Sequence, residues 1–241
     1  MKTFAIKEQR RARFTLSQIL EGIEGIAIAI ACYLTLFLKP WRDRWGLSKA
    51  EAECLLPGDD IIKKPKSQFT HAIEIDAPAE YVWPWIAQIG QGRGGFYSYV
   101  ALENLTGLNI INSDEVLPQF QNPKLGDLIP FGPKDAYPLV VCEPGYAMAI
   151  DHGRDLDTNT YIDPAVSYPK NYFHLTWLWL VEPIDEHKSR FISRNRVTYT
   201  ALLKHNLIFG LLMEPIIFAM DRKMCYGIKK RAEQLYRNSQ N

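Results

Sequence analysis

The sequence is poor in cysteine, and the cysteines that it has are widely spaced. Only four occur among 241 residues, at positions 32, 54, 142 and 225, and no two form a CxxC pair. A disulfide framework or a cysteine-based zinc site usually shows regular, close spacing. The five histidines show no HExxH or similar ligand spacing either. We therefore expect isolated thiols, no metal and no other cofactor.

The sequence also lacks a large net charge, which is +1 at pH 7. The charge is nevertheless uneven, because residues 1–49 carry +5 and the rest of the chain carries −4. The mildly acidic residues 50–241 are a poor partner for a polyanion such as nucleic acid. The basic residues 1–49, in contrast, are attracted to an anionic membrane surface. These features argue against nucleic acid as a partner and favour a membrane near the N-terminus.

Motifs of nucleophilic enzymes are absent, since no G-x-S-x-G elbow occurs. A glycine cluster from Gly90 to Gly95 matches the G-x-G-x-x-G pattern of dinucleotide-binding proteins. That pattern needs a preceding strand, but a helical pattern precedes it here. We interpret the glycines as a sharp turn that presents Arg93. Its guanidinium could form a bidentate pair with Glu103 inside the fold or with an anionic group of a ligand.

An apolar run extends from Ile19 to Leu38 and is followed by aromatic and basic residues from Lys39 to Trp45. Its length and its flanks favour a single-pass, uncleaved membrane anchor within residues 1–45. A helix packed on the folded domain is the alternative. Basic residues flank both ends, so the side of the membrane stays open. The second apolar stretch, His205–Ile217, contains Glu214-Pro215, and we do not expect it to span.

Residues 46–68 read as a short helix and a charged linker, and residues 69–237 as one domain. Alternation of apolar and polar side chains predicts strands, and a spacing of three and four residues predicts helices. A polar loop, roughly 152–171, is expected to be a lid or an excursion. The expected strands are Phe69–Asp76, Leu128–Phe131, Leu139–Glu143, Tyr146–Asp151, Tyr172–Val181 and Arg190–Thr200, and the expected helices are Ala79–Ile89 and a long one that includes Ile217 to Leu235.

Aromatic residues are concentrated at positions where they could line an apolar cavity or simply fill the core. Asp151-His152 at a strand end could supply acid–base chemistry or a local hydrogen bond. Arg194 could hold an acid group inside the cavity or lie on an outer charged face. The candidate ligand-binding residues are Trp85, Arg93, Phe96, Tyr97, Glu103, Asn104, Trp177, Trp179 and Arg194, with Trp83 and Tyr99 as further aromatic candidates.

Three phrases carry a resemblance to a known superfamily. They are IDAPAEYVWPWIAQIGQGRGGFYSYVALEN, NSDEVLPQFQNPKLGDLI and EPIIFAMDRKMCYGIKKRAEQL. With the order of the expected elements, they resemble the START, birch-pollen-allergen and polyketide-cyclase-like (SRPBCC) superfamily over about Trp45 to Leu235. The resemblance implies an α+β helix-grip fold, in which a curved antiparallel sheet surrounds a long C-terminal helix. An N-terminal, transmembrane helix would be an addition to that fold.

The resemblance implies a hydrophobic cavity between the sheet and the helix. Members bind lipids, sterols, polyketides or plant metabolites, and a minority are cyclases or hydratases with no shared catalytic set. We therefore expect a membrane-anchored, non-enzymatic protein that binds a hydrophobic or amphipathic small molecule or lipid. The alternative is a cyclase or dehydratase in which Arg93 polarises a carbonyl, Tyr97 or His152 moves a proton, and Glu103 orients the arginine.

Overall fold

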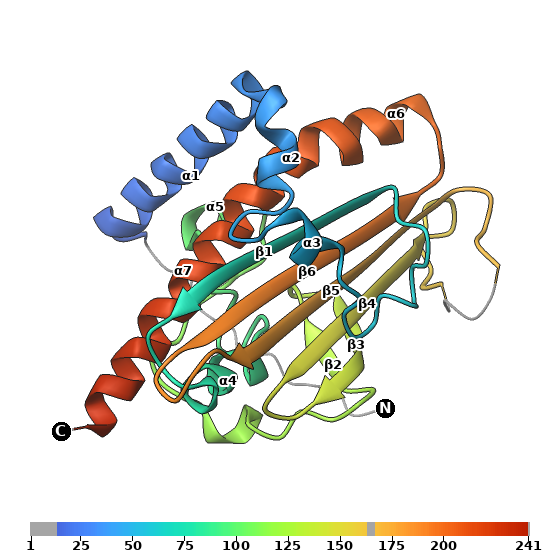
Figure 1. The fold of residues 1–241 in the computed structure, drawn as a ribbon. Helices are drawn as coiled ribbons and strands as arrows, with labels where there is room; N and C mark the ends of the chain where they lie inside the picture. The colour runs from blue at the N-terminus through green and yellow to red at the C-terminus, as the bar shows by residue number, and fades with distance from the viewer. Residues whose placement is uncertain (1–13, 163–166, 241) are drawn as a thin grey trace.

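Six antiparallel strands form the centre of the molecule, in the order β1-β6-β5-β4-β3-β2. The computed structural model describes residues 14–162 and 167–240. In Figure 1 the curved sheet lies against one long helix, the helix-grip arrangement of an α+β fold. The strands are β1 (Ser67–Ile75), β2 (Leu128–Pro130), β3 (Ala136–Glu143), β4 (Ala147–Asp155), β5 (Tyr172–Pro183) and β6 (Ser189–Tyr199).

The long helix α7 (Met213–Ser239) covers one face of the sheet, which we call the inner face. Its buried stripe includes Met224, Cys225 and Ile228, which share one core with Trp179 and Phe191 of the sheet. These helix positions are three or four residues apart, so they lie on one side of α7. The short helix α4 (Ala79–Ala87) packs into the same core, and the helix expected from Ala79 is confirmed with an earlier end.

The opposite, outer face of the sheet is covered by residues 46–66, which we call the strap. Leu47 and Leu56 of the strap pack against a second buried cluster that includes Ala149, Leu178 and Ile192. The helix α3 (Lys49–Glu53) lies within the strap and starts with a capping box at Ser48. The expected linker is therefore a packed cover of the sheet.

The strap begins at a glycine that the fold requires. Gly46 has a φ of +83°, and a Cβ atom there would lie 1.9 Å from the carbonyl oxygen of Ala72. The backbone amides of Thr70 and Ala72 donate to the carbonyls of Asp43 and Trp45. The chain thus runs directly along strand β1, too close for any side chain at position 46.

The N-terminal helix α1 (Leu16–Leu34) begins with a capping box between Thr15 and Gln18. Its buried residues include Gly22 and Gly25, which face the helix α5 (Val100–Leu105). Glu21 and Glu24 pair with Lys223 of α7 at 3.5 and 3.8 Å. The acids that interrupt the apolar run therefore have a partner in the folded domain, and α1 packs lengthwise against it.

Short elements connect these parts. They are η1 (Leu36–Leu38), α2 (Lys39–Arg42), η2 (Pro118–Phe120), α6 (Leu203–His205) and the π-helical segment η3 (Asn206–Leu212), which leads directly into α7. All six expected strands are present, with ends shifted by up to four residues. The expected basic leader up to Arg13 lies outside the described residues, as do positions 163–166 of the expected loop.

We predict that Gly25→Val detaches α1 from the domain. A Cβ at position 25 would lie 2.8 Å from the ring of Tyr99 and 2.9 Å from Leu102, so the helix must shift outward. Overpacking of this kind costs about 1–3 kcal/mol. Limited proteolysis should cut the Gly25→Val variant faster between α1 and α2. Ala27→Val, on the exposed side of α1, is the matched control and should be cut like the wild type. Equal cutting of both variants would contradict the observed packing of α1.

Candidate functional site

The inner face of the sheet has a defined set of side chains, because cross-strand partners lie on the same face. Trp177 of β5 is opposite Ile150 of β4 and Asn195 of β6. Two residues earlier on β5, Leu175 is opposite His152 of β4 and Val197 of β6. These residues alternate with side chains that contact the strap, so the row from His152 to Asn195 faces α7 and its N-terminal extension.

Solvent reaches this inner face at one end of the central strand β5. Its inward-facing residues Phe173, Leu175 and Trp177 are only half-buried, whereas the next two, Trp179 and Val181, are 0% and 1% exposed. The intervening outward-facing residues His174, Thr176 and Leu178 are buried under other segments. A central strand normally buries its inward side chains most completely. The first half of β5 therefore borders accessible space, and we call Phe173, Leu175 and Trp177, with His152 and Asn195, the inner-face site.

Two polar side chains accompany these apolar residues. Asn195 is 4% exposed, and its Nδ2 has no hydrogen-bond partner in the described part of the protein. Buried amide donors are nearly always paired, so an unpaired one is suited to an acceptor supplied by a ligand. His152 stacks on Tyr137 with ring centroids 3.9 Å apart. Burial and the neighbouring Arg154 lower the pKa of His152 to about 4, so its imidazole is neutral at pH 7.

A buried chain of hydrogen bonds runs from the inner-face site into α7. Trp177 Nε1 donates to Ser193 Oγ at 2.9 Å, and Ser193 Oγ donates to Asp221 Oδ1 at 2.8 Å. The other carboxylate oxygen of Asp221 bonds His71 Nδ1. Ser193, Asp221 and His71 are at most 2% exposed. Because each link uses up a donor and an acceptor, the chain fixes the Trp177 ring and holds α7 in place. Ser193 bonds the carboxylate, not the imidazole, so this is no nucleophile–base pair.

An open hollow of about 440 Å³ adjoins the site. It shares Tyr137 with the residues around His152, and it includes Arg154, which lies opposite Phe173 of β5. Arg154 forms a 3.0 Å ion pair with Asp135, and Lys134 lines the same hollow. The apolar inner-face site therefore borders an opening lined by two basic side chains and one acidic one, an arrangement that suits a molecule with an apolar body and an acidic end.

Arg93 is held against the glycine turn, although its buried Nε has no hydrogen-bond partner in the described part of the protein. Its Nη2 donates to the carbonyl of Ala87 at 2.7 Å, and its guanidinium lies 4.6 Å from the ring centroid of Phe120. No ion pair joins Arg93 to Glu103 among the described residues, so the expected pair is not formed. Burial lowers the pKa of Arg93, although the nearby Asp127 raises it. The arginine ties the turn to the end of α4.

Four aromatic candidates are enclosed in the core. Trp85, Phe96, Tyr97 and Trp179 are at most 4% exposed. Phe96 stacks on Trp177 with centroids 6.0 Å apart, and the Trp85 and Tyr97 rings meet edge to face at 6.1 Å. The Tyr97 hydroxyl donates to the Trp85 carbonyl, and burial raises its pKa far above the usual range. The sheet and helices are thus packed together at the glycine turn. Of the aromatic residues predicted to bind a ligand, Trp177 alone belongs to the inner-face site.

Glu103 and Asn104 have structural surroundings on α5. The Asn104 side chain donates to the Ile110 carbonyl at 2.9 Å and thereby fixes the loop after α5. Glu103 is 5% exposed, and its Oε2 has no partner among the described residues. Burial raises the pKa of Glu103 to about 8. Its carboxyl is therefore mostly protonated at pH 7 and does not orient Arg93.

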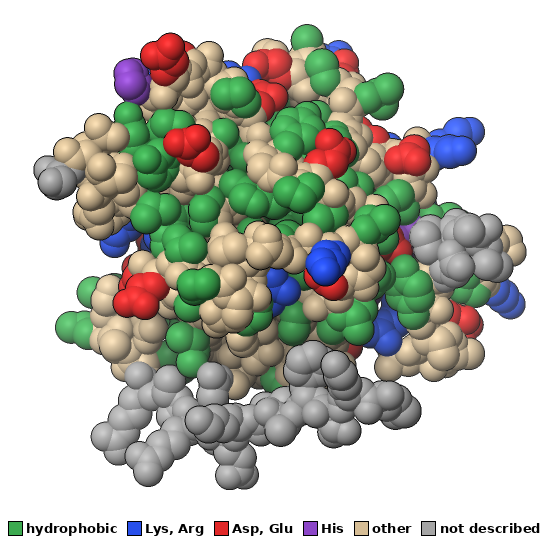
Figure 2. All heavy atoms as spheres, turned by 90° about the horizontal axis from the view of Figure 1, so that it is seen from below, with side chains coloured by type: hydrophobic (Ala, Val, Ile, Leu, Met, Phe, Trp, Pro, Cys, Tyr) green, Lys and Arg blue, Asp and Glu red, His purple; other side chains and the backbone are tan. Residues whose placement is uncertain are grey.

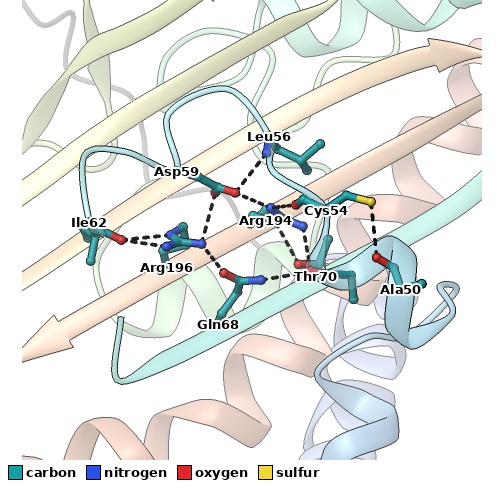
Figure 3. A network of polar contacts seen from close by, with 10 residues as sticks. Ala50, Cys54, Leu56, Asp59, Ile62, Gln68, Thr70, Arg194 and Arg196 are labelled. Carbon is teal, nitrogen blue, oxygen red and sulfur yellow. Dashed lines mark hydrogen bonds and ion pairs between the residues drawn. The ribbon is translucent and has the colours of Figure 1, made fainter. Parts of the chain in front are cut away.

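The expectation that Arg194 holds a ligand inside the cavity needs correction. Figure 3 shows Arg194 and Arg196 pointing from β6 toward the strap, on the outer face. Arg194 Nη1 pairs with Asp59 Oδ2 at 2.6 Å, and its other nitrogens donate to Thr70 Oγ1 and the Ala52 carbonyl. Arg194 is 1% exposed. Since each of its three nitrogens donates a hydrogen bond to the strap or to β1, it fastens the strap to the sheet.

Asn195 and Ser193 were absent from the sequence-based candidates. Both lie between arginines in the stretch Arg190–Arg196, so they read as polar spacers of a charged strand. The pairing of β6 with β5 reverses that reading, because it places them beside Trp177 and Trp179. In the described part of the chain, no three His, Cys, Asp or Glu side chains cluster so that they could hold a metal ion.

Comparisons with known proteins yield distant structural likenesses. No protein-family model and no curated protein matches the sequence. The Zhui aromatase/cyclase from Streptomyces sp. R1128 is 13% identical, with a TM-score of 0.32 over 70% of this chain and 94% of that one. The polyketide-cyclase-like protein Cgl2372 from Corynebacterium glutamicum is 15% identical, with a TM-score of 0.28 over 72% and 91%. Hypothetical protein jhp0584 from Helicobacter pylori is 8% identical, with a TM-score of 0.42 over 73% and 94%. At these values none transfers a substrate or an activity.

We predict that Asp59→Ala costs about 3–5 kcal/mol of the free energy of unfolding, because it leaves the buried Arg194 without its carboxylate. Asp60→Ala, at the neighbouring exposed position, is the control and should change stability by about 0.5 kcal/mol or less. Urea unfolding of the two variants measures the difference. A loss below about 1 kcal/mol for Asp59→Ala would show that the network of Figure 3 does not hold the strap.

We also predict that Glu103→Gln removes a pH dependence of stability. The pKa of Glu103 is about 8 in the folded protein, against 4.5 ordinarily. Between these values the folded state binds a proton that the unfolded chain has lost, so stability falls as pH rises. The decline is up to about 1.4 kcal/mol per pH unit. Unfolding curves at a series of pH values between 5 and about 8 should therefore show that the stability of Glu103→Gln, relative to that of the wild type, rises steadily with pH. Parallel pH profiles would contradict a buried, protonated Glu103.

Proposed function

We propose that this protein is a membrane-associated binding protein for a small amphipathic molecule, held at the inner-face site. The observation that carries the proposal is the exposure of Phe173, Leu175 and Trp177, which face α7 yet remain half-buried on the central strand. A side chain in that position would be enclosed if the sheet and helix closed over it completely. An apolar ligand body would cover these three residues and remove their contact with water.

Polar groups at the same site limit which molecule fits. The unpaired amide of Asn195 calls for a carbonyl or hydroxyl acceptor above Trp177. Lys134 and Arg154 at the adjoining hollow favour an acidic end that points outward. A fatty acid or a phenolic acid has both features. The ligand would therefore lie with its apolar part along β5 and its acid group toward β3 and β4.

The membrane part of the proposal is supported by composition and length. The helix Leu16–Leu34 and the helical stretch Leu203–Ser239 are each long and apolar enough to cross a membrane. The second owes its length to α7, whose buried stripe belongs to the core. We therefore assign the attachment to the N-terminal helix and its neighbours.

The cyclase or dehydratase alternative has weaker support. The Tyr97 hydroxyl is enclosed and donates to the Trp85 carbonyl, and Arg93 Nη2 donates to the Ala87 carbonyl, so both side chains are engaged in holding the glycine turn. His152 is the one member of that set within the inner-face site, and its low pKa makes it a weak base. We therefore favour binding without chemistry.

Blocking the inner-face site should abolish binding. Native mass spectrometry of the full chain, incubated with mixed fatty acids and with phenolic acids, should show one bound molecule from one of the two classes. Leu175→Trp fills the accessible space and should reduce the bound fraction at least tenfold, with unchanged circular dichroism. Leu55→Trp, on a strap residue that is 89% exposed, should bind like the wild type.

Two results would contradict the proposal. One is a wild-type protein that binds neither class of acid. The other is a Leu175→Trp variant that binds as well as the wild type while remaining folded. The second result would place the ligand elsewhere, for example in the open hollow beside Arg154 and Tyr161.

A further inference from the structure

Exposed hydrophobic side chains gather in two segments of the chain. Of the 29 large hydrophobic residues that are exposed in the described part of the protein, 19 lie in residues 14–41 or 202–216. Leu34 is 78% exposed, Phe37 79% and Leu203 76%. Soluble proteins rarely present so many such residues together, and a surface of this kind is normally covered by a partner or by lipid.

The two segments lie side by side, although residues 42–201 separate them in the sequence. The Tyr33 hydroxyl at the end of α1 donates to the Leu212 carbonyl, and Lys39 pairs with Glu214 at 2.9 Å. Figure 1 shows α1, α2 and α6 along the same upper side of the molecule. We call residues 14–41 and 202–216 together the apolar ledge.

The packing of α1 determines how this surface can meet a bilayer. Gly22 and Gly25 contact α5, Glu21 and Glu24 pair with Lys223, and Tyr33 bonds to η3. The helix is thus held from Glu21 to Tyr33. If α1 crossed a bilayer in this conformation, the charged and polar side chains of α5 and α7 would enter hydrocarbon. Each charge placed there costs several kcal/mol.

We propose that α1 lies parallel to the membrane and that the apolar ledge inserts as one surface into a single leaflet of an anionic bilayer. This inference rests on the membrane association proposed above and specifies its geometry. It does not depend on ligand binding. The outward residues of α1, such as Ile19, Ile26 and Ile30, would then lie at one depth, with the polar side of the helix turned toward the domain.

Charge identifies lipid as the occupant. Residues 1–13 carry five Lys or Arg against the single acid Glu8, and they connect directly to the ledge. A basic segment next to an inserted amphipathic helix is attracted to anionic headgroups. A second copy of the chain would cover the apolar residues, but it would bring the same positive charge. On the side seen from below, Figure 2 shows acidic and basic side chains scattered among hydrophobic ones.

The ledge also forms a wall of the inner-face site. Phe209 lies in η3, between exposed ledge residues, and its ring packs on Phe173 and Tyr199 at 4.6 and 5.2 Å. Leu207 and Leu211 of the same segment are 50% and 45% exposed on the outside. The bilayer-facing segment therefore touches the accessible end of β5 from its other side. A molecule dissolved in the leaflet would have a short path to the site.

Depth-dependent fluorescence quenching tests the orientation. Full-length protein with Cys54 and Cys142 changed to Ser carries one added cysteine at Leu16, Ile26, Leu34 or Leu207, labelled with an environment-sensitive dye. The vesicles contain phosphatidylcholine and phosphatidylglycerol with spin labels at a shallow or a deep acyl position. All four dyes should be quenched more by the shallow label. A dye at Glu53 of α3 should be quenched by neither.

If the dye at Ile26 is quenched more by the deep label than those at Leu16 and Leu34, α1 crosses the bilayer. That result would overturn the inference and leave membrane association intact. No binding of the wild type to the vesicles would instead refute the membrane association itself. A dimer that buries the dyes and shows no vesicle binding would make a second copy of the chain the occupant, and would also overturn the inference.

Variants test whether both segments take part. Leu207→Glu with Leu211→Glu places two charges on the second segment of the ledge. We expect at least a tenfold weaker partitioning into these vesicles. Leu55→Glu with Leu125→Glu, at residues that are 89% and 69% exposed elsewhere, should partition like the wild type. Equal partitioning of the two double variants would exclude residues 202–216 from the membrane surface and overturn the proposal of a single ledge.

Discussion

The central constraint of this structure is that both faces of one antiparallel sheet need a cover. Strand residues alternate between faces, so β5 and β6 place Trp177, Trp179 and Phe191 on one side and Leu178, Leu180 and Ile192 on the other. The helix α7 covers the first set and the strap covers the second. The strap contributes few apolar side chains of its own. Its attachment therefore depends on a buried ion pair and on backbone hydrogen bonds along β1.

Because both faces of the sheet are buried, some features of the fold could be predicted from the sequence and others could not. The alternation of β1, β5 and β6 and the stripe of α7 predicted these strands and the long helix, because periodicity is a local property, whereas the helix-grip arrangement came from the resemblance to a known superfamily. Which face of β6 meets α7 is not local. Arg194 and Asn195 exchange sides if the strand is turned over, and both sides of β6 contain buried residues. The assignment of Arg194 to the cavity failed there, and the role of Asn195 was missed for the same reason.

The location of accessible space was even less predictable from sequence. The aromatic residues near the glycine turn and those on β5 are alike in type and spacing, yet Tyr97 is enclosed and Trp177 is not. The difference lies in distant segments. Trp85, Phe96 and Ile228 fill the region around Tyr97, whereas the cluster that includes Phe173 is met from the helical side by Phe209 of η3 and Ile217 of α7. Space is left open where side chains from several distant segments do not meet, and no single stretch of sequence shows where that happens.

The segment η3 belongs both to the exposed apolar ledge and to the wall of the inner-face site. It interrupts a regular helix with π-helical turns, whose hydrogen bonds are less favourable than those of an α-helix and which occur mostly at functional sites. None of its residues is fully buried, so few contacts resist its movement. In the proposed membrane contact its outer side chains would gain free energy from lipid, while its inner Phe209 packs on Phe173 at the end of β5. On the proposed membrane contact, a bilayer that draws the outer side chains away from the domain would weaken the contact between Phe209 and Phe173, and the inner-face site would open toward the leaflet.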